Sequence, residues 1–250
     1  MLTPERHRVI LQLLKEKNII KIQEVMELTN SSESTIRRDL SMLEKQKYLK
    51  RIHGGAKVLQ GKLQEPSMEE KSSKNLQEKR LIAKYAASLV EKGDCIYLDA
   101  GSTIFEMIEY LEVKDIVVVT NGLMHFSSLI NKGIPVYGIG GFVKPKTNAF
   151  VGRGALASLE LYRFDKCFMG VNGIHPQFGY TTPDQEEALV KQRAISLTRE
   201  AFVIADSSKF SEISFAKITD IHEASIITNE IDTGMEKQYL NRTTIKVVTT

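Results

Sequence analysis

The sequence predicts an α/β protein with a winged helix-turn-helix domain over residues 1–59 and a larger domain over residues 75–250, which are joined by a linker over residues 60–74. The first sixty residues contain three short amphipathic helical patterns and one hairpin pattern. Beyond residue 94, apolar strand-like runs alternate with helical runs, which indicates a doubly wound, mainly parallel sheet. The segment between them is polar and rich in Lys, Glu and Ser, which is typical of a linker.

Composition places the chain among globular proteins. Hydrophobic residues make up 42% of the 250 positions and charged residues 26%, so a sizeable core is expected. Because no signal-peptide pattern or run of eighteen apolar residues occurs, the sequence predicts a cytoplasmic protein with no membrane contact. Cys95 and Cys167 lie far apart in apolar runs and are predicted to be buried. We expect no metal and no cofactor, since no clustered Cys/His spacing is present.

The net charge of +3 is unevenly distributed. Residues 1–60 carry 12 Lys and Arg against 7 Asp and Glu, whereas the rest of the chain carries 22 against 24. A basic excess on a small segment suits contact with a phosphate backbone. A domain with a neutral partner can show the same excess by chance, so charge alone is weak evidence.

Apolar spacing predicts helices over residues 4–17, 22–28 and 32–46. Thr3 is the predicted N-cap of the first helix and Pro4 its first residue. The third helix opens at Ser32, where Ser31, Ser32 and Ser34 all offer capping hydroxyls. The third helix places its apolar stripe on one face and small polar and basic residues on the other: Ser34, Thr35, Arg37 and Arg38. This is the layout of a recognition helix that enters the DNA major groove. The alternative is an ordinary amphipathic helix with a solvated arginine pair.

Residues 48–59 have the pattern of a β-hairpin around Gly54-Gly55. A hairpin at this place after the recognition helix corresponds to the wing of a winged helix. Its basic residues are predicted to lie along the sugar-phosphate backbone: Lys50, Arg51 and His53, with Lys57 beside them. His53 has an alternative interpretation as a turn residue bonded only to the main chain.

One motif pair in this domain carries a family resemblance. The string Ser34-Thr35-Ile36-Arg37-Arg38-Asp39-Leu40, followed ten residues later by Arg51-Ile52-His53-Gly54-Gly55-Ala56, resembles the signature of the DeoR family of bacterial repressors. The resemblance implies a domain that binds operator DNA. Two positions depart from the family pattern: Ser31 stands where a hydrophobic residue is usual, and Lys47 stands where a glycine enters the wing.

In the larger domain, candidate strands cover residues 95–99, 116–120, 135–140, 166–170, 202–206 and 225–228, and most end in small, polar or glycine-rich loops. In an open parallel sheet such carboxyl ends line one crevice, which is the usual ligand site. Gly101-Ser102-Thr103 precedes a predicted helix, so main-chain N–H groups and two hydroxyls are expected to face an anion. A phosphate is the natural candidate, although such turns also serve merely to connect elements.

The C-terminal motifs extend the resemblance over essentially the whole chain. Asp99-Ala100-Gly101, Val119-Thr120-Asn121, Gly140-Gly141, Glu187-Ala188-Leu189-Val190-Lys191 and Ala205-Asp206-Ser207-Ser208-Lys209 resemble the DeoR sensor domain. The resemblance implies a ribose-5-phosphate isomerase-like fold that binds a sugar phosphate. Residues 97–101, 181–184 and 210–215 are most similar to fructose-operon repressors, which implies repression relieved by fructose 1-phosphate.

Several effector residues follow from position in the family pattern. Lys71, Lys79, Asp206 and Lys209 match residues tied to effector response, and Lys191 matches a basic residue that faces the crevice. Lysines supply cations to a phosphate, while carboxylates and amides bond sugar hydroxyls. The complete predicted effector set is Lys71, Lys79, Asp99, Gly101, Ser102, Thr103, Asn121, Gly140, Gly141, Asn172, Lys191, Asp206 and Lys209. Alternatively, Asp206 and Lys209 form only a local ion pair, and Lys71 and Lys79 are solvated.

The competing hypothesis is an enzyme, a sugar-phosphate isomerase or deaminase that uses the same fold. The N-terminal winged helix argues against it, and no nucleophile–base motif is present. We therefore expect no catalytic residues. The predicted partners are operator DNA, a sugar-phosphate effector and further copies of the same chain, because one winged helix alone binds DNA weakly.

Overall fold

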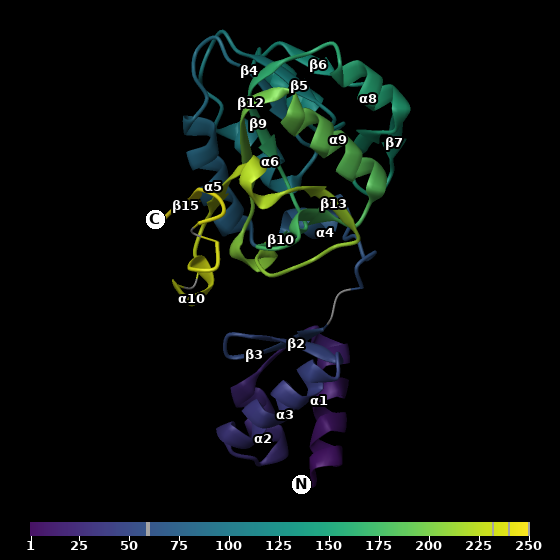
Figure 1. Cartoon of the computed structure of the whole chain (residues 1–250), viewed down its shortest axis with the longest axis vertical. Helices are drawn as coiled ribbons and strands as arrows, with labels where there is room; N and C mark the ends of the chain where they lie inside the picture. The colour runs from purple at the N-terminus through teal and green to yellow at the C-terminus, as the bar shows by residue number, and fades with distance from the viewer. Residues whose placement is uncertain (59–60, 232, 240, 250) are drawn as a thin grey trace. The chain divides into compact units, whose positions relative to one another are not determined.

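The computed structural model describes residues 1–58, 61–231, 233–239 and 241–249. The chain divides into two compact units, Met1–Gly61 and Lys62–Thr250 (Figure 1). We call them the N-terminal unit and the α/β unit, and each is described by itself.

The N-terminal unit is a winged helix-turn-helix. Its elements are α1 (Thr3–Lys17), β1 (Ile19–Lys21), α2 (Ile22–Thr29), α3 (Glu33–Lys45), β2 (Leu49–Ile52) and β3 (Gly55–Val58). The strands form an antiparallel sheet in the order β1-β3-β2. Apolar side chains from all three helices meet in one core, among them Ile10, Val25, Ile36 and Leu40. All three predicted helices are present, whereas β1 was not expected.

The predicted caps of α1 and α3 have different outcomes. Of the three serines that offered a capping hydroxyl, Ser32 caps α3, since its hydroxyl accepts a hydrogen bond from the Thr35 N–H at 3.4 Å. The N-cap of α1 is Leu2 instead of Thr3. Thr3 lies inside the helix, and its hydroxyl accepts a hydrogen bond from the Arg6 guanidinium at 3.1 Å. The Glu5 carboxylate accepts a hydrogen bond from the N–H of the N-cap residue Leu2 at 3.1 Å, as the acidic residue of a capping box does.

The wing requires glycine at two successive positions. Pairing of Ile52 with Gly55 leaves His53 and Gly54 as a two-residue turn, with Gly54 at φ +72°. At Gly55 a Cβ would lie 2.0 Å from the Ile20 carbonyl oxygen, so β1 and β3 approach this closely only without a side chain. The Gly-Gly pair therefore fixes both the turn and the third strand.

The junction between α3 and β2 explains one of the two departures from the family pattern. Lys47 has φ +61°. The Lys47 and Tyr48 N–H groups donate to the carbonyls of Glu44 and Leu43 at 2.9 and 3.0 Å, which is the bonding of a Schellman motif. Glycine is favoured at this position because a Cβ destabilises the left-handed conformation. Lys47 therefore holds a strained backbone at the position where the family pattern has glycine.

We expect the Lys47→Gly variant to be more stable than the parent. Relief of the left-handed strain should raise the free energy of unfolding of the N-terminal unit by about 0.5–1 kcal/mol. Lys45→Gly is the matched control, since the last residue of α3 is helical and glycine there should cost about 1 kcal/mol. Urea denaturation of the full chain measures both, and a Lys47→Gly variant less stable than the parent would contradict the account.

The α/β unit contains a seven-stranded sheet, all of it parallel, in the order β15-β14-β12-β9-β4-β5-β6. Its strands are β4 (Cys95–Leu98), β5 (Val117–Thr120), β6 (Val136–Gly138), β9 (Phe164–Met169), β12 (Thr198–Ile204), β14 (Ser225–Thr228) and β15 (Ile245–Val247). The helices of this unit are α4 (Met68–Ser73), α5 (Leu76–Ser88), α6 (Ser102–Glu109), α7 (His125–Asn131), α8 (Arg153–Leu159), α9 (Gln185–Ser196) and α10 (Thr233–Glu236), with short 3₁₀ turns η1 (Ser207–Lys209) and η2 (Ile221–Glu223).

Two apolar layers cover the two faces of this sheet. Residues of α5, α6 and α7 pack on one face, including Ile82, Met107 and Leu129. Residues of α8 and α9 pack on the other, including Leu159 and Val190. The doubly wound architecture predicted from alternating strand and helix patterns is confirmed.

Five short strands outside the main sheet were not predicted. β7 (Phe142–Lys144) pairs with β8 (Ala149–Val151), and β10 (Gly173–His175), β11 (Gly179–Thr182) and β13 (Ala216–Thr219) form a separate antiparallel sheet. Each is only three or four residues long, which is too short for a periodic pattern to develop. The Phe150 N–H donates to the Asn121 carbonyl at 2.8 Å, so the β7-β8 hairpin lies against the carboxyl end of β5.

The segment expected to be a linker contains helix α4. Its N-terminus is a capping box in which Ser67 Oγ accepts from the Glu70 N–H and the Glu70 carboxylate accepts from the Ser67 N–H. Two backbone bonds tie this segment to the α/β unit: Met68 N–H to the Lys146 carbonyl at 3.0 Å, and Phe215 N–H to the Lys62 carbonyl at 3.1 Å. Residues 62–74 therefore pack as part of the α/β unit.

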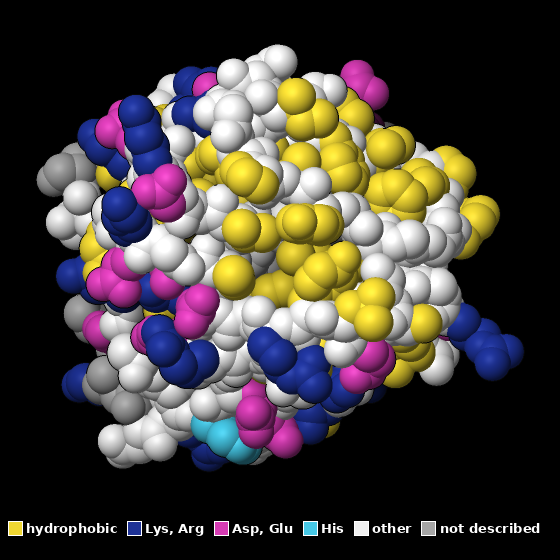
Figure 2. Space-filling model, turned by 90° about the horizontal axis from the view of Figure 1, so that it is seen from above, with side chains coloured by type: hydrophobic (Ala, Val, Ile, Leu, Met, Phe, Trp, Pro, Cys, Tyr) yellow, Lys and Arg dark blue, Asp and Glu magenta, His cyan; other side chains and the backbone are white. Residues whose placement is uncertain are grey.

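Hydrophobic side chains also gather on one outer face of the α/β unit (Figure 2). The most exposed large apolar residues include Ile130, Tyr137, Phe142 and Leu161. Tyr137 belongs to β6, an edge strand of the main sheet, and its ring lies 6.0 Å from that of Tyr162. Within the described residues, none of the helices is long and apolar enough to cross a membrane.

Candidate functional site

Helix α3 presents a polar face to solvent. Ile36, Leu40 and Leu43 are buried, whereas Ser34, Arg37 and Arg38 are exposed and Thr35 is half-buried. The Ser32 hydroxyl lies 3.0 Å from that of Ser34 and 2.9 Å from that of Thr35. The predicted reading face is thus a hydroxyl cluster at the helix N-terminus followed by two arginines.

The two arginines differ in their partners. Both Nη2 and Nε of Arg37 bond Glu33 Oε1, at 2.6 and 2.8 Å. Within the described residues, the Arg38 side chain has no hydrogen-bond or ion-pair partner. Arg38 is therefore available to a ligand without the loss of an existing contact.

Asp39 has a structural contact that sequence reasoning missed. Its side chain is buried and accepts bonds from Arg6 at 2.7 and 3.2 Å, and His7 Nε2 lies 3.2 Å from Asp39 Oδ1. The hydrogen bond with Asp39 raises the pKa of Arg6. The motif residue Asp39 thus attaches α1 to α3 beneath the reading face. The sequence gave no local signal for the Arg6–Asp39 pair, because the two residues lie 33 positions apart.

The wing residues are not equally exposed. Arg51 is half-buried: its Nη1 donates to Ser41 Oγ at 2.6 Å, and its N–H donates to Glu44 Oε1 at 2.8 Å. Arg51 therefore attaches the wing to α3. Lys50 lies opposite Lys57 across the hairpin, and His53 is exposed in the turn.

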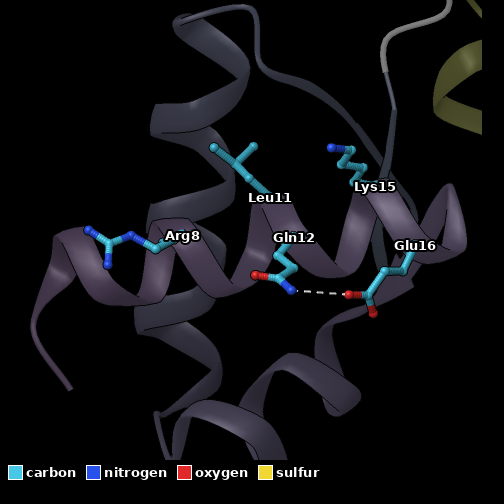
Figure 3. Close-up of a pocket in the computed structure, with 5 residues that line it drawn as sticks. All are labelled: Arg8, Leu11, Gln12, Lys15 and Glu16. Atoms are coloured by element: carbon cyan, nitrogen blue, oxygen red, sulfur yellow. Dashed lines mark hydrogen bonds between the residues drawn. The ribbon is translucent and has the colours of Figure 1, made fainter.

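A hollow lies on the outer face of α1. It is lined by Arg8, Leu11, Gln12, Lys15 and Glu16, with Gln12 bonded to Glu16 at 3.2 Å (Figure 3). None of the predicted DNA-binding or effector residues lines this hollow.

The carboxyl ends of β4 and β9 lie side by side at the centre of the sheet in the α/β unit. The strands that follow β4 in the sequence, β5 and β6, add to the sheet on one side of β4. The strands that follow β9, which are β12, β14 and β15, add to it on the opposite side. The strand order therefore reverses between β4 and β9, which is the topological switch point. Asp99 Oδ2 accepts a bond from the Gly170 N–H at 3.0 Å and forms an ion pair with Lys191. Asp99 Oδ1 is buried and has no hydrogen-bond partner in the part of the chain that the structure describes. One acceptor atom thus remains unsatisfied at this point.

Helix α6 begins directly beyond Asp99. Gly101 is its N-cap, Ser102 and Thr103 are buried in its first turn, and no acidic residue is present there. The Ser102 and Thr103 hydroxyls make no side-chain hydrogen bond with any other described residue. Unpaired N–H groups at a helix N-terminus favour an anion.

Lysines from four different elements lie close enough to affect one another's pKa. Lys71 lies in α4, Lys79 in α5, Lys191 in α9 and Lys209 in η1. Burial lowers the pKa of Lys71, and the Lys191 and Lys209 ammonium groups lower it further. Burial and Lys209 likewise lower the pKa of Lys79, whose Nζ donates to the Lys71 carbonyl. The structure therefore brings together four lysines that lie up to 138 residues apart in the sequence.

Asp206 is buried next to this group. Burial alone would raise its pKa, but the Lys209 ammonium and hydrogen bonds from Ser208 and Asn75 outweigh burial and lower it. The Asn75 amide donates to Asp206 Oδ1 at 2.9 Å, and the Ser208 N–H donates to the same oxygen at 3.1 Å. Asp206 therefore both caps η1 and joins it to the start of α5.

A second charged group adjoins the lysines, and sequence reasoning gave it no role. Lys144 Nζ contacts Glu65, Asp184 at 2.9 Å and Glu187 at 3.2 Å. Burial alone would lower the pKa of Lys144, but hydrogen bonds to Glu65 and Asp184 raise it. Glu187 also accepts from Thr147 Oγ1 at 2.6 Å. Glu65 and Lys144 lie 79 residues apart in ordinary polar surroundings, so no sequence signal marked them.

The other predicted effector residues have contacts within the crevice loops. Asn121 Oδ1 accepts from the Ala100 N–H at 2.9 Å, which links the loops after β4 and β5. Asn172 Oδ1 accepts from Thr182 Oγ1 at 3.1 Å. Gly141 has φ +122°, and a Cβ there would lie 2.5 Å from the Val151 carbonyl, whereas Gly140 borders open space. Asn121, Asn172 and Gly141 thus contact neighbouring loops.

Within the described part of the chain, no group of three or more His, Cys, Asp and Glu side chains could hold a metal ion. A winged helix-turn-helix unit followed by a doubly wound α/β unit is the domain arrangement of a DNA-binding transcriptional regulator.

Comparison with known families identifies this class further. The DeoR-like helix-turn-helix domain matches residues 6–62, and the DeoR C terminal sensor domain matches residues 74–230. The chain therefore belongs to the DeoR family. It is a regulator and not an enzyme, as the sequence predicted.

Two curated relatives extend over nearly the whole chain. The HTH-type transcriptional regulator FruR of Bacillus subtilis is 53% identical over 249 residues, which is 99% of each chain. The lactose phosphotransferase system repressor of Staphylococcus epidermidis is 32% identical over 243 residues, which is 96% of each. Among solved structures, ribose 5-phosphate isomerase A from Neisseria gonorrhoeae is 20% identical, with a TM-score of 0.40 over 54% of this chain and 53% of that one.

Proposed function

We propose that the protein represses a sugar-utilisation operon and leaves its operator when a phosphorylated sugar, fructose 1-phosphate, binds the α/β unit. The observation that carries this proposal is the proximity of Lys71, Lys79 and Lys209: Lys79 Nζ donates to the Lys71 carbonyl, and the Lys209 ammonium lowers the pKa of both other lysines. Neighbouring cations suit a phosphate dianion, and the N-terminus of α6 in the same unit also favours an anion. The repressor relative and the name FruR agree with a sugar-linked role.

The ion pairs indicate which cations are available to that phosphate. Lys191 is paired with Asp99, and Lys144 is shared among carboxylates. The nearest carboxylate oxygen to Lys71 Nζ lies 3.9 Å away, on Glu65. We assign the phosphate to Lys71, Lys79, Lys209 and the Gly101-Ser102-Thr103 turn, and the sugar hydroxyls to Asp99 and Asp206. Lys191 orients Asp99, while Asn121, Asn172, Gly140 and Gly141 shape the rim.

On the DNA side, we assign base contacts to Ser34, Thr35, Arg37 and Arg38, and backbone contacts to Lys50, Arg51 and His53. A single winged helix buries only about 600–1,000 Å² on DNA. We therefore propose a homo-oligomer that places recognition helices on half-sites about 34 Å apart, or multiples of that distance. Because it acts on operator DNA, we place its activity in the cytoplasm.

Calorimetric titration of the purified protein with fructose 1-phosphate, fructose 6-phosphate and fructose tests the proposal. Fructose should fail to bind, because the lysines have no anion to contact, and fructose 1-phosphate should bind most tightly. Equal binding of fructose and its phosphates would overturn the phosphate assignment. Tighter binding of another sugar phosphate would overturn only the assignment of fructose 1-phosphate.

Effector affinity should pass through a maximum with pH. It should rise from pH 5 to about 7, as the phosphate takes its second negative charge with a pKa of about 6. It should fall again at alkaline pH, because the ammonium forms of Lys71 and Lys79 bind the anion and their pKa values lie below the ordinary 10.5. Titrations at constant ionic strength measure this profile, and an affinity that keeps rising up to pH 10 would contradict it.

A further inference from the structure

Glu65 is a buried carboxylate on the segment that follows the N-terminal unit. Its side chain is only 7% exposed. One oxygen, Oε2, pairs with Lys144, while Oε1 has no hydrogen-bond partner among the described residues and lies 3.9 Å from Lys71 Nζ. Glu65 therefore stands between the Lys144 group and the lysines assigned to the phosphate.

Glu65 belongs to a group of closely spaced carboxylates and ammonium groups. Three carboxylates, those of Glu65, Asp184 and Glu187, surround the Lys144 ammonium, and Lys71 is the next cation. Asp184 and Glu187 are fixed at the start of α9, since Asp184 caps that helix and Glu187 bonds Thr147. If the Lys71 ammonium pairs with a bound anion instead of Glu65, the carboxylates of Glu65, Asp184 and Glu187 have only the Lys144 ammonium as a partner in this group. Like charges at this distance repel strongly in a partly buried site.

Resting on the proposed function, we propose that Glu65 competes with the effector phosphate for Lys71, so that phosphate binding expels Glu65 and loosens residues 62–68 from the α/β unit. Glu65 is the carboxylate that moves because the other two are held by α9. The segment it sits on follows directly after the N-terminal unit, which ends at Gly61. The state of Glu65 thus transmits effector binding toward the DNA-binding unit.

Two main-chain hydrogen bonds report on this movement. The Met68 N–H donates to the Lys146 carbonyl, and the Phe215 N–H donates to the Lys62 carbonyl. Both bonds hold residues 62–68 against the α/β unit and flank Glu65. Expulsion of Glu65 should break or weaken both, which exposes these amides to solvent exchange.

Glu65→Gln removes the charge and keeps the shape of the side chain. Glu69→Gln, an exposed carboxylate of α4, is the matched control. The Glu65→Gln variant should bind fructose 1-phosphate at least about fivefold more tightly than the parent, because one anion near the phosphate is gone. The ratio of operator affinity without and with effector should shrink by at least about fivefold, since no charge is left to expel. Glu69→Gln should match the parent in both measurements.

An unchanged release ratio, or weaker effector binding by Glu65→Gln, overturns the competition. If no sugar phosphate binds the parent, the proposed function fails and the competition fails with it. A measurement on the parent alone guards against a variant that does not fold: saturating fructose 1-phosphate should speed amide exchange at Met68 and Phe215. Exchange at these amides that is unchanged or slower also overturns the proposal.

Discussion

Lys209→Ala should produce a regulator that binds operator as the parent does but needs roughly 10- to 150-fold more fructose 1-phosphate to leave it. The Lys209 ammonium is close enough to Asp206, Lys71 and Lys79 to shift all three pKa values, and within the described residues it has no ion-pair partner. Loss of a charge-assisted contact to phosphate is worth about 1.5–3 kcal/mol. The N-terminal unit is untouched, so operator affinity without effector should stay the same.

Operator-binding titrations across effector concentrations measure this effect. Lys217→Ala is the matched control, because Lys217 is an exposed lysine paired with Asp220 at 2.7 Å. Identical release curves for Lys209→Ala and the parent would mean that Lys209 is only a turn residue. The crevice would then lie elsewhere in the unit.

Arg38→Ala should weaken operator binding by about 1–3 kcal/mol, roughly 5- to 150-fold, and relax the preference for operator over random DNA. Arg38 is exposed and has no partner to give up, whereas Arg37 is held by Glu33. Arg37→Ala should therefore cost less than Arg38→Ala, because Arg37 must leave Glu33 before it contacts a base or phosphate.

Mobility-shift titrations with operator and scrambled DNA at fixed salt measure both variants. Lys45→Ala, in the last turn of the same helix, is the control for loss of one positive charge. If Arg37→Ala and Arg38→Ala both bind operator like the parent, α3 is not the recognition helix.

The elements that the sequence predicted well are those with strong local signals. Continuous apolar runs identified the strands β4, β5, β9, β12 and β14, and the 3.6-residue period identified α1 and α3. The strand order could not be read in the same way, because it depends on which runs pair across the fold. β15 and the short strands of the β7-β8 and β10-β11-β13 sheets carry too few residues to show a period.

In the candidate site, too, the residues with a local sequence signal were predicted and those without one were missed or rested on family resemblance. The Gly101-Ser102-Thr103 turn and the Asp99 strand end follow from local pattern, and the structure places them at the switch point. Lys71 and Lys79 were tied to the effector only by family resemblance, because no sequence pattern shows that a lysine is buried. Glu65 with Lys144, and Arg6 with Asp39, were missed since their partners lie 79 and 33 residues away.

Reciprocal coupling between operator and effector tests the central claim most directly. If fructose 1-phosphate releases the repressor, operator DNA must weaken fructose 1-phosphate binding by the same factor that the effector weakens operator binding, typically about 5- to 150-fold. The measurement is the dissociation constant of each ligand for the parent protein, with and without saturating amounts of the other. The account predicts two equal factors within that range. Fructose 1-phosphate that binds equally well to the free and the operator-bound protein would contradict it.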